Sequence, residues 1–442
     1  MLCLTACGGG GGGDDSNRST TTDWQRDILL TSLTIDLETM QGRADIQLAG
    51  SLSSNGASFE TGDLIITQVT SNGRQLNYQV ENGTLDISLP HSTDDQIVSI
   101  DYNFNLQSNF NGLLDNGASF TWPYYCGNLF PCKSVPDEGS RYELQINGTP
   151  NGTEAIYPTS IISDAPAYML AWATGDYAFT NLGTTNAGTE VGVYYLADQQ
   201  QQALDGSRYL RDAFDWYERT YGPYPFGQSV ASVSVDWGTG QIGGMEHHPY
   251  WHIATDSFDD PLVHVHEAAH GWFGNGVRIA CWEDFVLSEG LVSYLTARAI
   301  SEVAGASSGE QVWMSYEDKL ERLQQSNENK IAWPPGCNQI DILQDELFGT
   351  APYMKGAFFF RHLEYTLGVK QFDQILSNFY KAKVGQAASL DELLEMIEHA
   401  SGYAPDDCAM AWLRSETVPG SDSCRFKPNS PDAAHPPAEV SF

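Results

Sequence analysis

The hydrophobic pattern of this chain changes its period near Ala203, and no other feature constrains the possible folds as strongly. Before that position apolar and polar residues alternate, as in Leu33–Leu37, and Asn-Gly turn signals separate the alternating runs. After it, apolar residues recur three and four positions apart, which is the spacing of amphipathic helices. The two periods predict an α+β multidomain protein, in which an antiparallel β-sheet or sandwich domain is followed by a mainly helical domain.

A length of 442 residues favours two or three domains, and the pattern divides the chain into four parts. We expect a signal remnant with a glycine-rich tether (1–22), a β-domain (23–200), a helical domain (201–425) and a disordered tail with four prolines (426–442). The helical domain is predicted to contain a strand over 229–235 and helices over about 204–221, 261–274, 288–303, 309–325, 355–367, 370–383 and 389–401.

The N-terminus resembles the processing box of bacterial lipoproteins, because the sequence LTAC ends at Cys7 and six glycines follow as a flexible tether. Only six residues precede Cys7, which is short for a signal peptide, so the natural start lies upstream or the match is chance. No apolar run is long enough to span a membrane. We expect a periplasmic or extracellular protein that is anchored to a bacterial membrane by lipid on Cys7.

The charge balance is strongly acidic, with 22 basic residues against 57 acidic ones and a formal net charge of −35. Such a surface repels nucleic acid and anionic membranes, so nucleic-acid binding is excluded from the expected functions. It favours solubility and is compatible with cationic substrates. The sequence predicts no protein partner.

Six cysteines follow the N-terminal segment, and an even number fits disulfides in an oxidising compartment. Proximity in sequence favours Cys126 with Cys132 and Cys408 with Cys424, which leaves Cys281 with Cys337. The alternative is a set of free buried thiols.

A metal site is indicated by the sequence His266-Glu267-Ala268-Ala269-His270 in the helix that Asp260 and Pro261 are expected to start. Histidines four positions apart lie on one face of a helix, so both imidazoles can bind one zinc ion. Glu267 is then placed to take a proton from the metal-bound water. The alternative is two histidines on an ordinary helix face.

A third ligand is available at Glu289, nineteen positions after His270, where a second helix is expected to begin. Two histidines and one carboxylate leave the fourth position of a tetrahedral zinc ion to water, as catalytic zinc requires.

The stretch from His266 to Tyr294 resembles the gluzincin aminopeptidases, the family of aminopeptidase N and the leukotriene hydrolases, whose pattern is H-E-x-x-H, eighteen residues, then E. The resemblance implies a thermolysin-like catalytic domain with one zinc ion per chain. It also implies that the substrates are peptides with a free N-terminus.

Two further segments resemble this family in the expected order. Gly243-Gly244-Met245-Glu246-His247 resembles the G-x-M-E-N strand, which implies that Glu246 holds the substrate's α-ammonium group while the backbone of Gly243 and Gly244 aligns the peptide. Residues 352–357 (PYMKGA) resemble the P-Y-x-K-G-A segment, which implies that Tyr353 donates a hydrogen bond to the oxyanion. The resemblance covers roughly residues 110–420.

This chain also departs from the family pattern. His247 and Ser288 replace asparagines, and the segment Thr121–Tyr125 lacks the Q-x-E pair that usually helps to hold the ammonium group. Strict exopeptidase action is therefore in doubt. The chain ends soon after the catalytic domain, so we expect a short two-domain member without the C-terminal helical domain and with an open site.

Two other functions remain possible on the sequence alone. One is a zinc endopeptidase of the same clan, which the missing second amine anchor suggests. The other is a catalytically inactive surface lipoprotein that binds peptides.

Overall fold

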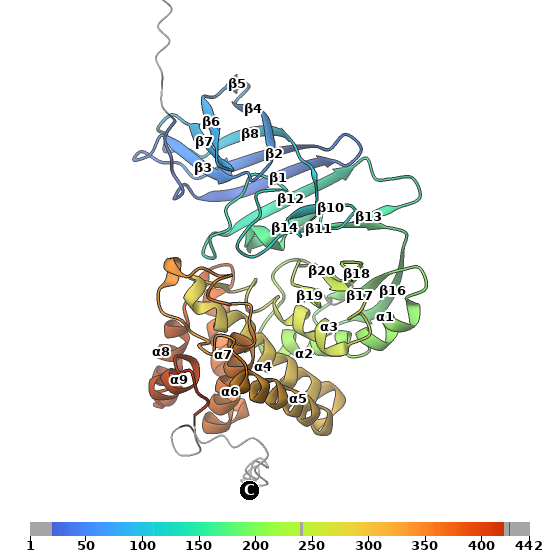
Figure 1. The fold of residues 1–442 in the computed structure, drawn as a ribbon, viewed down its shortest axis with the longest axis vertical. Helices are drawn as coiled ribbons and strands as arrows, with labels where there is room; N and C mark the ends of the chain where they lie inside the picture. Colours follow the sequence, from blue (N-terminus) through green and yellow to red (C-terminus); the bar gives the residue numbers. More distant parts are fainter. Residues whose placement is uncertain (1–19, 109, 239–241, 420–423, 425–442) are drawn as a thin grey trace, which may run out of the picture.

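The structure is a computed structural model that describes residues 20–108, 110–238, 242–419 and 424. Cys7, most of the expected tether and the expected tail after 425 lie outside these residues. Figure 1 shows a β-rich part, coloured blue to teal, above a part that is mainly helical and coloured green to red. The predicted α+β order is confirmed, with β-structure first and helices second.

The N-terminal part is built on a seven-stranded sheet with the strand order β14-β12-β1-β2-β8-β4-β5. Along β2, apolar side chains such as Ile46 are buried and their polar neighbours face outward, which is why the sequence alternates. Most pairs are antiparallel, as predicted, but β1 and β12 run parallel. These two strands are far apart in sequence, so no hairpin fixes their relative direction. The strands are β1 (Ile28–Asp36), β2 (Gln41–Leu48), β4 (Ile65–Ser71), β5 (Arg74–Gln75), β8 (Gln96–Asn103), β12 (Ser140–Asn147) and β14 (Ser160–Ala165).

Three smaller sheets complete this part, with the orders β3-β7-β6, β11-β10-β9 and β13-β15. Their strands are β3 (Gly56–Glu60), β6 (Tyr78–Glu81), β7 (Thr84–Ser88), β9 (Leu106–Gln107), β10 (Gly112–Leu114), β11 (Ser119–Phe120), β13 (Glu154–Ile156) and β15 (Ala173–Gly175). A 3₁₀ turn, η1 (Ala167–Met169), follows β14.

A five-stranded sheet links the two parts, in the order β16-β17-β18-β20-β19. Its strands are β16 (Tyr177–Thr184), β17 (Glu190–Leu196), β18 (Ser229–Val235), β19 (Gly244–Met245) and β20 (Tyr250–Ala254). The sheet continues across the boundary predicted at residue 200, because β17 pairs with β18 in parallel. The alternation of apolar and polar residues in β16 and β17 indicates that they are strands, but it does not indicate which sheet they join. The sheet favours a boundary near Asp176, and the division into domains stays a prediction.

The helical part surrounds α4, which is buried along most of its length. The expected helices are present, but the one predicted over 204–221 is divided into α1 and α2, and α3 ends at Ala269 instead of 274. The chain turns after α3 through Gly274, whose φ of +104° a helix cannot contain. The helices are α1 (Gln200–Ser207), α2 (Leu210–Thr220), α3 (Pro261–Ala269), α4 (Phe285–Ala304), α5 (Ala306–Gln325), α6 (Thr350–Leu367), α7 (Val369–Lys383), α8 (Leu390–Ser401) and α9 (Asp406–Leu413). Two 3₁₀ turns, η2 (Trp282–Asp284) and η3 (Cys337–Gln339), and a two-stranded sheet of β21 (Arg278–Ile279) and β22 (Ala387–Ala388) complete this part.

The buried Arg278 side chain joins the two parts. Its guanidinium donates hydrogen bonds to the carbonyls of Asp137 (3.3 Å) and Asp164 (3.1 Å) in the N-terminal part and of Gly385 (3.2 Å) in the helical part. These contacts fix the orientation of the β-rich part above the helices.

All three predicted disulfides, Cys126–Cys132, Cys281–Cys337 and Cys408–Cys424, are confirmed. Among the described residues, no helix combines the length and the apolar character that a membrane span requires.

Candidate active site

Helix α3 carries the two predicted histidine ligands. Asp260 caps its N-terminus by accepting the backbone N–H of Leu262, and Pro261 takes the first position, as the sequence predicts. His266 lies in the last turn and His270 is the C-cap residue. One turn of helix separates the two residues, and their ring centroids are 5.1 Å apart.

Glu289, on the buried helix α4, points at both histidines. Its Oε2 atom lies 3.2 Å from Nε2 of His266 and 3.5 Å from Nε2 of His270. In a tetrahedral site with bonds of about 2.0–2.2 Å, two ligand atoms lie about 3.3–3.5 Å apart. The two distances from Glu289 and the N, N, O chemistry of the three donors therefore fit one zinc ion.

The surroundings of His270 favour the same arrangement. Its Nδ1–H donates a hydrogen bond to the carbonyl of Phe273 at 3.2 Å, so Nε2 is the nitrogen left to bind a metal. Gly274 permits this close approach, since a Cβ at that position would lie 2.6 Å from His270 Nδ1. The residues present therefore fit a zinc ion.

Glu267 and Glu246 bring two more carboxylates to this point. Ligand atoms of Glu246, Glu267 and His270 all lie within 4.8 Å of one another. Burial raises the pKa of both carboxyl groups. The Glu267 carboxylate packs on the backbone of Gly244, where an added Cβ would lie 2.4 Å from Oε1.

Tyr353, near the start of α6, lies on the His266 side of the site. Its ring stacks on the His266 imidazole with a centroid distance of 6.3 Å and an angle of 21°. Burial raises the pKa of its phenol, so the hydroxyl keeps its proton and can donate it in a hydrogen bond.

A cavity of about 600 Å³ connects these groups. The eight residues predicted for the site all line it: Gly243, Gly244, Glu246, His266, Glu267, His270, Glu289 and Tyr353. The structure thus brings together the whole predicted set, whose chemical roles stay predictions.

Comparison with known proteins identifies a domain in the helical part. Residues 253–412 match the model of the Peptidase family M1 domain. The chain carries a peptidase family M1 domain. The matched residues contain the three predicted metal ligands, Glu267 and Tyr353, whereas Glu246 lies just before the match.

Curated relatives of the M1 domain include fungal aminopeptidases. The chain is 28% identical over 279 residues to a protein of Pyricularia oryzae named "Leucine aminopeptidase 2", covering 57% of this chain and 44% of the relative. It is 26% identical over 337 residues to a "Leukotriene A-4 hydrolase homolog" of Botryotinia fuckeliana, covering 69% of this chain and 49% of the relative. The chain spans about half the length of the curated relatives it matches.

Solved structures of M1 proteins share the fold over a greater length. The M1 zinc metallopeptidase of Deinococcus radiodurans superposes with a TM-score of 0.76 at 17% identity, covering 89% of this chain and 95% of that chain. Yeast LTA4 hydrolase gives a TM-score of 0.74 at 19% identity, covering 89% and 68%. The order of a β-rich part and a helical part is thus that of two-domain M1 structures.

The segment that lacks the Q-x-E pair contributes an aromatic wall beside the M1 domain's cavity. Trp122 and Tyr124 stack with a centroid distance of 5.5 Å and an angle of 23°. Phe348, from the loop before α6, packs on both rings, at 5.7 Å from Trp122 and 5.9 Å from Tyr124. All three line the cavity, so aromatic surface occupies this side of it.

The two residues that replace family asparagines have structural partners. His247 is buried, and its Nδ1 and Nε2 lie 3.1 Å from Nδ1 of His252 and 3.4 Å from the Thr121 carbonyl. Ser288 Oγ lies 3.4 Å from Nδ1 of His270. His247 thus joins the end of β19 to the N-terminal part, and Ser288 contacts a metal-binding side chain of the M1 domain.

Three buried residues that sequence reasoning missed support the M1 site. His248 donates from Nε2 to the Glu267 carbonyl at 2.7 Å and accepts from the Tyr224 hydroxyl at 2.8 Å. Asn275 donates to the Glu246 carbonyl at 2.7 Å and accepts from the Tyr168 hydroxyl at 2.8 Å. Adjacent histidines at 247 and 248 were a visible signal, but nothing in the sequence indicated Tyr168.

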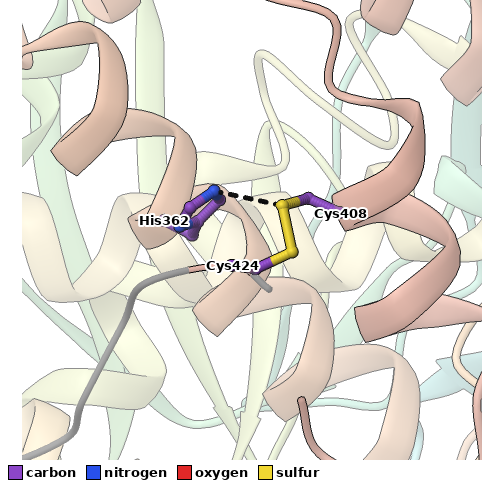
Figure 2. Close-up of side chains that lie close together, drawn as sticks. All are labelled: His362, Cys408 and Cys424. Atoms are coloured by element: carbon purple, nitrogen blue, oxygen red, sulfur yellow. Dashed lines mark hydrogen bonds between the residues drawn. A yellow bond between two sulfur atoms is a disulfide. The ribbon is translucent and has the colours of Figure 1, made fainter. Parts of the chain in front are cut away.

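A second cluster with metal-binding residue types lies between α6 and α9 (Figure 2). His362 Nε2 lies 3.4 Å from Sγ of Cys408, but that sulfur is bonded to Cys424. Because a disulfide has no thiolate to offer a metal, this group is a packing contact and not a second metal site.

Proposed function

We propose that this protein is a zinc-dependent aminopeptidase that removes N-terminal residues from peptides, with one zinc ion per chain held by His266, His270 and Glu289. The observation that carries this proposal is the position of the Glu246 carboxylate, which lies within 4.8 Å of ligand atoms of both Glu267 and His270. The curated relatives that carry the name leucine aminopeptidase support it.

The position of Glu246 selects the first peptide bond. A carboxylate binds an α-ammonium group through charge-assisted hydrogen bonds. In that bound residue the nitrogen lies only about 2.5 Å from the carbonyl carbon, given standard bond lengths and angles. A substrate held by Glu246 therefore has its first carbonyl beside Glu267, which favours the aminopeptidase over an endopeptidase.

The chain's own residues supply the remaining chemistry. When bound, zinc would polarise the scissile carbonyl and lower the pKa of a bound water. Glu267 would take the proton from the attacking water and deliver it to the leaving amine. The Tyr353 hydroxyl would donate a hydrogen bond to the oxygen that becomes negative.

The backbone of β19 is suited to align the peptide. Within the described residues this strand is at the edge of its sheet and pairs with β20 alone. An extended peptide can pair with the free side of such a strand through main-chain hydrogen bonds. Gly243 and Gly244 line the cavity there and leave room for the peptide next to Glu267.

The test compares a free and a blocked amine on the zinc-loaded protein. We expect hydrolysis of an aminoacyl p-nitroanilide that a chelator abolishes and added zinc restores, and no hydrolysis of the N-acetylated analogue. Glu246→Ala should raise KM for the free amine, whereas Glu321→Gln, at an exposed glutamate on α5, should not. Equal cleavage of both substrates would establish an endopeptidase instead, and cleavage of neither would leave a peptide-binding protein.

The metal stoichiometry has its own measurement. We expect one zinc per chain by elemental analysis and a loss of metal in His266→Ala and His270→Ala. Zinc retained in both variants would contradict the assigned ligands.

We also infer that Cys7 is lipidated and that the protein is periplasmic or extracellular, anchored to a bacterial membrane. The support is the LTAC sequence and the six glycines that follow it. Labelling with a radioactive fatty acid in a bacterial host should mark the protein and not Cys7→Ala, and equal labelling would refute this inference.

A further inference from the structure

One basic side chain, Lys319 on α5, reaches the cavity that holds the predicted active site. Among the described residues that line this cavity, it is the only lysine or arginine. The acidic residues that line the same cavity include Glu246, Glu267 and Glu289. A single cation at an otherwise acidic cavity is a candidate for reading a negative group of a substrate.

Lys319 is exposed and has no partner of opposite charge. Within the part of the chain that the structure describes, no carboxylate lies within 4.0 Å of its Nζ atom, whose recorded neighbour is the Tyr316 ring at 5.8 Å from the centroid. Other basic side chains of the helical part do pair with carboxylates: Arg298, Arg361, Lys383 and Arg414. In a chain with 57 acidic and 22 basic residues, an unpaired lysine leaves a charge that a ligand can use.

Lys319 lines the same cavity as Glu246 and the three predicted metal ligands. Tyr316, one turn before Lys319 on α5, and His266 on α3 line this cavity as well. Glu246 interacts with His270 and with Tyr168 of η1. Asp260 and Tyr316 line the Lys319 end of the cavity, and the Asp260 carboxylate already accepts the backbone N–H of Leu262.

We propose that Lys319 is a carboxylate-binding subsite that makes short peptides with a free C-terminus the preferred substrates, an inference that rests on the aminopeptidase function proposed above. A peptide whose ammonium group is at Glu246 lies in the cavity that Lys319 also lines. Each extended residue spans about 3.3–3.6 Å, so a carboxylate within a few residues of the amine comes close to a flexible lysine. Acidic side chains near the N-terminus offer the same chemistry.

The experiment measures kcat/KM of the zinc-loaded enzyme for trialanine and for trialanine amide, which differ only in the terminal carboxylate. We expect Lys319→Gln to lower the ratio of the first value to the second by about fivefold, since an exposed ion pair contributes about 1 kcal/mol or less. Lys319→Arg should retain the ratio. The matched control is Lys370→Gln, an exposed lysine on α7, and it should leave the ratio at the parent value.

A second arm identifies the source of the carboxylate. Amides of Ala-Glu-Ala and Ala-Gln-Ala differ only in a side-chain carboxylate. A Lys319-dependent difference in either arm supports the carboxylate subsite, and the arm that shows it names the source. Equal losses for all substrates, or no loss for any, would overturn the proposal.

Failure of the aminopeptidase function would show separately, as no turnover of any free-amine substrate. The same comparison can then be made by calorimetry, with the zinc-loaded Glu267→Gln variant and each peptide pair. Binding of the carboxylate peptide that does not depend on Lys319 would also overturn the proposal.

Discussion

Helices α4 and α6 meet at two glycines, and the contact can be tested with Gly290→Ala. A Cβ at position 290 would lie 2.8 Å from Cα of Gly356 and 2.8 Å from the carbonyl oxygen of Pro352. Favourable carbon contacts are about 3.5–4.0 Å, so the two helices would have to separate by roughly 1 Å. Both neighbours are backbone atoms, which cannot turn away as a side chain can.

The expected change in stability follows from two opposing effects. Overpacking of a tight interface costs about 1–3 kcal/mol. Alanine in place of glycine inside a helix contributes up to about 1 kcal/mol in the other direction. We therefore expect a net loss of about 1–2 kcal/mol, or a Tm lower by about 3–6 °C for a domain of this size.

The same change should reduce activity, because Glu289 precedes Gly290 on α4 and Tyr353 lies on α6. A displacement of 1 Å in an active site can reduce the rate by about a hundredfold. Differential scanning calorimetry and kcat on an aminoacyl p-nitroanilide measure the two effects.

A double variant with Val286→Ala separates the causes. The added methyl would also lie 2.8 Å from Cγ2 of Val286, and the second substitution removes only that contact. We expect less than half of the loss to be restored. A single variant with unchanged Tm and kcat would refute the close contact of the helices.

Three other variants test the site. Glu267→Gln should keep zinc, measured by elemental analysis, and lose turnover, because an amide cannot accept the proton; substantial remaining activity would assign the base elsewhere. Tyr353→Phe should lower kcat by about a hundredfold with little change in KM, as the loss of one oxyanion donor does, and an unchanged kcat would refute that role. His248→Leu should destabilise the zinc-loaded protein by about 1–3 kcal/mol in urea denaturation, because it leaves the Glu267 carbonyl and the Tyr224 hydroxyl without their buried partner. Equal stability would mean that water or another group replaces the imidazole.

The metal-binding geometry could be predicted because its information is local. The spacing of His266 and His270 follows from the helical period, and Glu289 lies on the next long helix of the chain. The strands and helices were likewise predictable from periods of two and 3.6 residues. The break between α1 and α2 was not, because the apolar spacing continues through Arg208 and Tyr209.

The remaining parts depend on contacts between distant segments, which no local pattern encodes. The sequence did not show that β1 and β12 pair in parallel or that β16 and β17 join the sheet of β18. Tyr168, His248 and Lys319 reach the site only because of how the chain packs. The missing Q-x-E pair was visible, but the aromatic surface that occupies this place was not.

The aromatic wall formed by Trp122, Tyr124 and Phe348 has a consequence for how substitutions would act on this protein. The three predicted metal ligands lie within 24 consecutive residues, from His266 to Glu289, in one half of the molecule. The surface that a peptide side chain meets is shared, since Trp122 and Tyr124 come from the other half and rest on Phe348. Substitutions where the two halves meet can therefore change which peptides fit while the three predicted metal ligands stay the same. On the proposed function, substrate choice can then evolve separately from the reaction.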